Sequence, residues 1–263
     1  MNLLMRRECA WVLLITAMWW LGIFSSGPIM SQVEIKHKIM IIPFEPRLYM
    51  SQVDQIINRE TKLSQKEIRN TFRRGISDLL FVQFKKKYEV INLLQDTVKY
   101  GKLLGIIYER IGYSFDKVPE AGIYKAPVSE KESKNKNVTK GQLTVESDPT
   151  LRFMNVKIKD GGLVPGLFGK YKTDVYVFIS QLDLLSNAVA QNDIQNIVER
   201  RIAIHYSVYT VDAKEIQSGL CSIKFPDNCN QPGRILSEYI KKICVEISGR
   251  IMVALQPPDE KKK

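Results

Sequence analysis

The segment Lys38–Phe44 constrains the fold most, because its sequence KIMIIPF carries four consecutive apolar residues that end at a proline. A strand that is apolar at consecutive positions is typical of a sheet covered by helices on both faces. A helix with one apolar face follows over Ile68–Phe84, after the capping-box pattern Ser64-x-x-Glu67. This order predicts parallel strand pairing through a crossover helix.

The rest of the chain alternates strands and helices and then adds an antiparallel hairpin. The spacing predicts the strand Tyr88–Leu93, the helix Gln95–Ile111, the strands Leu151–Ile158 and Thr173–Ser180, the hairpin strands Arg200–Val211 and Ile216–Phe225, and a last helix through Ile235–Ile251. We therefore expect an α/β fold: a mixed β-sheet of about five strands with flanking amphipathic helices, plus a loop-rich insertion.

The first hairpin strand alternates over many residues and so predicts two different faces. One face carries Ile202, Ile204, Tyr206 and Val208; the other carries Arg201, Ala203, His205, Ser207 and Tyr209. Such a pattern is typical of a strand whose apolar face lies against the core.

The N-terminal segment, residues 1–32, is interpreted as a secretory signal. Arg6 and Arg7 precede the apolar run Ala10–Phe24, and small residues such as Ser31 follow it. The alternative is an uncleaved anchor, although a spanning helix needs roughly 20 apolar residues. The protein is expected to be exported, periplasmic or outer-membrane associated, or else tethered by this helix.

The remainder is predicted to be one α/β domain, residues 33–256, with an insertion at 114–172 and a charged tail at 257–263. Within the insertion, Ser129–Gly141 is charged and nearly devoid of apolar residues, so it is expected to stay mobile. Its lysines are candidates for contact with an anionic surface, and simple solvation is the alternative. They are Lys131, Lys134, Lys136 and Lys140.

A second candidate site is the apolar segment Gly161–Gly169, GGLVPGLFG, which is expected to be a loop. If it is exposed, its side chains would form an apolar patch for a partner or a membrane; the alternative is a loop folded over the core. The candidate interface residues are Leu163, Val164, Pro165, Leu167 and Phe168.

The net charge and the cysteines limit the classes of partner and the cellular compartment that we expect for the protein. The net charge of +11 suits anionic lipid, surface polysaccharide or acidic proteins, and export makes nucleic acid an unexpected partner. An oxidising compartment permits a disulfide, and Cys221 and Cys229 are the candidate pair across the loop Ser222–Asn228. Cys244 is expected to be a buried apolar residue.

The residues that commonly carry catalysis are sparse. The only two histidines are His37 and His205, and no clustered His, Cys or carboxylate spacing indicates a metal site. No G-x-S-x-G motif occurs. We expect no enzyme activity, no cofactor and no metal.

The pattern resembles the periplasmic α/β domain shared by the N-terminal part of TolB, CsgG and LpoB. The segments that carry the resemblance are Ile39–Phe44, Ile68–Phe84, Tyr88–Leu93, Thr173–Ser180 and Ile204–Gly219. The resemblance implies an envelope protein that binds other proteins without catalysis, often as a ring or an accessory subunit. Two features differ from many members: no lipobox cysteine is present, and the insertion is longer.

The leading hypothesis is a non-catalytic accessory or scaffold subunit of a secretion, assembly or cell-wall machine. Its partners would be other envelope proteins or further copies of itself, with peripheral membrane contact as an addition. The first alternative is an envelope hydrolase that acts on glycan or peptide, which predicts convergent carboxylates. The second is a membrane-associated or pore-forming oligomer with Leu151–Phe168 as the inserting hairpin.

Overall fold

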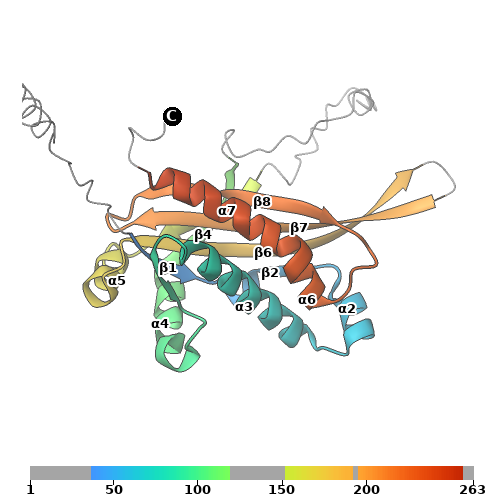
Figure 1. Ribbon diagram of the computed structural model, residues 1–263, viewed down its shortest axis with the longest axis horizontal. Coiled ribbons are helices and arrows are strands. Elements are labelled where there is room, and N and C mark those ends of the chain that lie inside the picture. The colour runs from blue at the N-terminus through green and yellow to red at the C-terminus, as the bar shows by residue number, and fades with distance from the viewer. Residues whose placement is uncertain (1–36, 119–151, 192–194, 257–263) are drawn as a thin grey trace, which may run out of the picture. The chain divides into compact units, whose positions relative to one another are not determined.

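The computed structural model describes residues 37–118, 152–191 and 195–256, with side chains described outside 187–199 (Figure 1). The predicted export signal, most of the predicted insertion loop and the charged tail lie outside these ranges, so their assignment stays a prediction.

Six strands form one mixed sheet (Figure 1). They are β1 (Lys38–Ile42), β2 (Tyr49–Ser51), β3 (Glu89–Asn92), β6 (Val175–Gln191), β7 (Gln195–Thr210) and β8 (Glu215–Phe225). The order is β3-β1-β6-β7-β8, and β2 also pairs with β6. β1 runs parallel to β3 and β6, whereas β6, β7 and β8 are antiparallel. The mixed sheet and the early parallel pairing are confirmed.

Helices and a small ribbon cover the two faces of this sheet. On one face lie α2 (Asp54–Thr61), α3 (Gln65–Phe84), α6 (Pro232–Arg234), the π-helix η6 (Ile235–Ile240) and α7 (Lys241–Ala254). On the other face lie α4 (Thr97–Arg110), α5 (Leu163–Tyr171) and an antiparallel ribbon of β4 (Ile111–Lys117) and β5 (Arg152–Ile158). The 3-10 turn η1 (Pro46–Leu48) joins β1 to β2. Within the described ranges, no helix combines the length and the apolar content that a membrane span requires.

The core has two parts, one on each face of the sheet, because β1, β6 and β7 alternate. In β1, Ile39 and Ile41 face α3 and α7, and Met40 and Ile42 face α4 and α5. All four are buried, which confirms the strand predicted to be covered on both faces.

The longest helix, α3, begins where the sequence places its capping box. The Ser64 hydroxyl accepts the Glu67 N–H at 3.3 Å, and the Glu67 carboxylate accepts the Ser64 N–H at 2.7 Å. Gly75 lets this helix approach η6 closely, because a Cβ there would lie 2.5 Å from a methyl of Leu236. The approach brings α3 and α7 together over the sheet.

The expected loop at Gly161–Gly169 is wrong, because most of it forms α5. Leu163, Val164 and Leu167 lie on one side of that helix and are buried against α4 and the sheet. Only Pro165 and Phe168 of the five candidate interface residues are exposed. The apolar residues therefore build core, and Leu151–Phe168 is not a single hairpin.

A β-bulge at Ser180 changes which side chains of β6 point toward each face of the sheet. Ile179 is opposite Tyr206 and Gln181 is opposite His205, so one extra residue sits between them. The extra residue puts Leu182 and Leu184 on the α3 and α7 side.

The predicted disulfide is not formed, and Cys221, Cys229 and Cys244 are free thiols. Four extended residues separate Cys221 from the end of β8, or about 13 Å. Cys229 lies in the turn that follows β8, where its N–H donates to the carbonyl oxygen of Pro226 at 3.2 Å. A bridge needs Cα atoms within about 7 Å. Cys244 is buried, as predicted.

Alkylation of residues 33–263, unfolded without reductant, should label all three thiols. The native protein should react slowly, because burial raises the pKa of Cys221 to about 12 and also raises the pKa of Cys244. Intact mass spectrometry measures the number of labels. One label without reductant and three labels after reduction would show that the disulfide is present.

Candidate functional site

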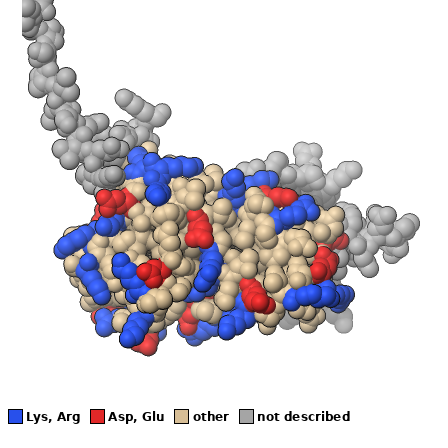
Figure 2. Space-filling view, turned by 60° about the horizontal axis from the view of Figure 1, so that its bottom comes forward, with Lys and Arg blue, Asp and Glu red and all other residues tan. Residues whose placement is uncertain are grey.

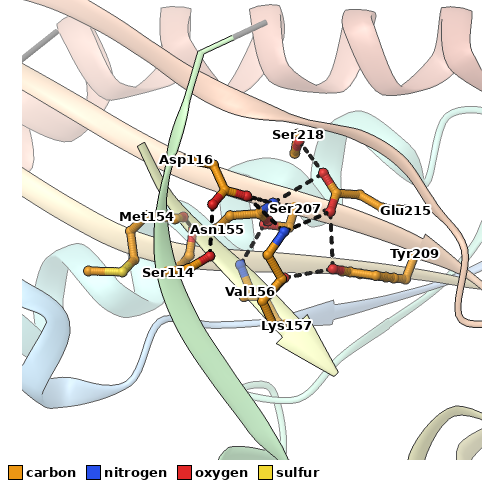
Figure 3. A network of polar contacts seen from close by, with 11 residues as sticks. Ser114, Asp116, Met154, Asn155, Val156, Lys157, Ser207, Tyr209, Glu215 and Ser218 are labelled. Atoms are coloured by element: carbon orange, nitrogen blue, oxygen red, sulfur yellow. Dashed lines mark hydrogen bonds and ion pairs between the residues drawn. The ribbon is translucent and has the colours of Figure 1, made fainter. Parts of the chain in front are cut away.

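A network of polar side chains lies where the β4–β5 ribbon crosses the sheet (Figure 3). One edge of β5 pairs with β4. Side chains of β7 meet the backbone of the other edge: the Met154 N–H donates to His205 Nδ1 at 2.9 Å, and the Val156 N–H donates to Ser207 Oγ at 3.1 Å. The side chains of β7 thus supply the hydrogen bonds that the backbone of a neighbouring strand supplies in an ordinary sheet.

The carbonyl groups of the same two β5 residues are also satisfied. Ser180 at the β6 bulge donates to the Met154 carbonyl at 2.5 Å, and Tyr209 donates to the Val156 carbonyl at 2.6 Å. His205, Ser207 and Tyr209 alternate along β7 and so project from one face, which the sequence pattern predicted.

Asn155 lies at the centre of this cluster and is 2% exposed. Its Nδ2 donates to Asp116 at 2.8 Å and to Glu215 at 3.1 Å, and its Oδ1 accepts from Ser207 at 2.6 Å. One buried amide therefore connects the ribbon, β7 and the start of β8.

The charged part of the cluster faces solvent. Lys157 Nζ lies 2.7 Å from Asp116 and 3.8 Å from Glu215 (Figure 3). The hydrogen bond from Lys157 lowers the pKa of Asp116, and the same bond raises the pKa of Lys157. Glu215 also accepts a hydrogen bond from Ser218 and lies 3.2 Å from the Tyr209 hydroxyl, whose pKa is raised by burial.

This arrangement attaches the ribbon to the sheet. Asp116 and Glu215 converge, and the lowered pKa of Asp116 keeps its carboxylate ionised beside Lys157. The hydroxyl of Ser207 donates to Asn155 and accepts from the Val156 N–H, so its hydrogen bonds are used within the protein.

The two histidines are held by carboxylates. Because His205 Nδ1 accepts the Met154 N–H, we assign the proton to Nε2, which lies 3.0 Å from Asp183. Both nitrogens of His205 are therefore engaged, which leaves none for a base. His37 Nδ1 lies 2.6 Å from Asp174, whose other oxygen accepts the Lys38 N–H.

The structure does not bring the predicted site residues into this cluster. Lys131, Lys134, Lys136 and Lys140 lie outside the described residues. Pro165 and Phe168 are on α5, and Cys221 and Cys229 belong to the core on the other face. The polar alternation of β7 is the one sign of the cluster in the sequence. Its members on β4 and β5 come together only through the fold.

Positive charge is spread over the surface and does not form one block on the face seen in Figure 2. Lysine and arginine side chains there alternate with aspartate and glutamate and with uncharged residues. This distribution agrees with lysines that serve solubility over much of that face.

The ion pair of Asp116 should stabilise the fold in a defined pH window. Because the folded pKa is depressed, its contribution is present above the unfolded value of about 3.9 and is lost as the pH falls through the folded pKa. Urea unfolding should therefore show a deficit for Asp116→Asn at pH 6 that shrinks at pH 3. Asp212→Asn, in the exposed β7–β8 turn, is the control; an equal deficit at both pH values would contradict the ion pair.

Comparisons with known proteins are limited to distant structures. Neither a family model nor a curated protein matches the sequence. A lipoprotein of Neisseria meningitidis has 10% identity and a TM-score of 0.30, over 81% of this chain and 99% of that chain. A hypothetical protein of Chlamydia trachomatis has 10% identity and a TM-score of 0.35, over 82% and 95%.

At this level of similarity the two structures carry no conclusion about function. The fold is that of a mixed α/β protein with a β-ribbon attached across its sheet. Neither of these two structures is named as TolB, CsgG or LpoB, so that resemblance stays a prediction.

Proposed function

We propose that the chain is an exported, non-catalytic envelope protein that acts as an accessory or scaffold subunit by binding another protein. The observation that carries the proposal is how the polar cluster is used: His205, Ser207 and Tyr209 all bond to the backbone of β5. Groups that could have served catalysis instead fix the shape of a surface. The apolar run in residues 1–32 supports export.

A shape fixed in this way suits recognition. Interfaces between preorganised partners lose less free energy to the ordering of side chains and loops. The ribbon and the sheet are joined by hydrogen bonds at 2.5–3.1 Å, so their relative position is defined before any partner arrives.

Capture of the tagged full chain from gently solubilised membranes tests the proposal. We expect one reproducible partner in a fixed ratio, recovered also after chemical crosslinking in intact cells. Recovery of the chain alone in both experiments would overturn the proposal. So would turnover of glycan or peptide by the purified chain that is lost in Asp116→Asn.

A further inference from the structure

The strand β3 forms one end of the main sheet. Among the described residues its strand partner is β1, in parallel register from Lys38–Glu89 to Ile41–Asn92. An edge strand presents backbone N–H and C=O groups at alternate residues, which another chain can pair with. The edge at β3 is thus a place where a further strand can add.

A groove of about 470 Å³ runs along this edge. Val90 faces α3 and Ile91 faces α4, and both are only partly buried. Apolar surface is therefore available on both sides of the strand. The wall on the α3 side is aromatic, with Phe81 and Tyr88.

The charge around the groove is mostly positive. Lys85, Lys86 and Lys87 are all exposed and lie just before Tyr88 and β3. Lys85 Nζ lies 5.3 Å from the centre of the Phe81 ring, so its charge sits over the apolar wall. Lys38 reaches Glu89, the single acidic residue of β3, at 3.4 Å.

We propose that the β3 edge binds an extended acidic segment of a partner protein, which adds a strand to the sheet. Its backbone pairs with β3, alternate apolar side chains lie on Phe81 and Val90, and its carboxylates meet Lys85 and Lys87. This inference rests on the proposed function, because it names the surface and the chemistry of the partner. Lysines at a sheet edge can also prevent a further strand from pairing there. Peptide binding distinguishes this protective role from the binding of an acidic segment.

Labelled peptides test the edge directly by fluorescence anisotropy with the full chain. The probe is an eight-residue peptide that alternates valine and glutamate. One control replaces glutamate with lysine, and a second carries N-methyl groups on alternate backbone amides. We expect saturable binding of the acidic probe and at least about tenfold weaker binding of both controls. Equal binding of the N-methylated peptide would overturn strand addition.

Variants locate the binding on the protein. The double change Lys85→Glu and Lys87→Glu should weaken binding about tenfold, whereas Lys66→Glu with Lys241→Glu, on exposed positions elsewhere, should not. Hydrogen exchange at Val90, whose N–H points away from β1, should slow when the probe binds. Unchanged affinity in the first variant, or unchanged exchange, would leave the lysines as edge protection and overturn the proposal.

Two further outcomes separate this inference from the proposed function. If the first double variant still captures the same partner from membranes, the edge is not the binding surface and the proposed function stands. If the purified chain dimerises through this edge, as sedimentation with the same variant would show, a second copy is the occupant and the acidic partner is overturned.

Discussion

Replacing Phe72 with alanine should lower the free energy of unfolding by about 3–5 kcal/mol. The side chain has no exposed surface, lies on the inner face of α3 and stacks on Tyr49 with ring centroids 6.4 Å apart. Removing the ring takes away apolar contacts and leaves a cavity that neighbours on α3 and the sheet fill only in part. Urea unfolding followed by circular dichroism measures the loss.

The same helix supplies a control for Phe72. Val82 is 56% exposed, so Val82→Ala should change the free energy of unfolding by no more than about 0.5 kcal/mol. Comparable losses in both variants would contradict the role given to core packing at Phe72, because alanine is the better helix former at both positions.

The second large effect is expected at His205. A leucine there leaves the Met154 N–H and the Asp183 carboxylate without the imidazole, at a cost of about 2–4 kcal/mol. Because His205 joins β7 to β5, the loss should appear first as local opening of the ribbon. Hydrogen exchange at Met154 should therefore rise more than exchange in β1.

An asparagine at His205 tests the assignment of the nitrogen roles. Its side-chain oxygen can accept the Met154 N–H from a position near that of Nδ1, so His205→Asn should recover part of the loss. If leucine and asparagine give the same free energy of unfolding and the same exchange at Met154, the hydrogen bond to β5 does not hold the ribbon.

The sequence predicted the layers well where a single period ran through a whole element. Ile39 to Ile42 indicated a strand covered on both sides, and the alternation from Ile202 to Tyr209 assigned both faces of β7. These predictions hold because the periodicity depends only on which layer of the fold each residue faces. It does not depend on which residue it contacts in that layer. The mixed sheet followed from them.

Prediction failed where the outcome depended on which segments meet. Ile111–Lys117 becomes a strand because Arg152–Ile158, remote in sequence, pairs with it. The glycines and Pro165 around Leu163 predict a loop, yet the segment forms α5. Proline is tolerated in the first turn of a helix, where its missing N–H costs no bond.

The polar cluster could not be predicted from the sequence for the same reason. Asp116, Asn155 and Glu215 belong to three strands, and neither their spacing nor their types single them out in the sequence. The disulfide was predicted from a short separation, whereas an extended strand between two cysteines keeps them apart.

The pairing of Lys117 with Arg152 at the end of the ribbon has a consequence for how the chain can be altered. The chain between these two residues therefore starts and ends at neighbouring points of the ribbon. The entropy of closing a connection rises only slowly with its length, and doubling that length costs about 0.6 kcal/mol. We therefore expect that residues inserted between Lys117 and Arg152 leave the register of the sheet unchanged.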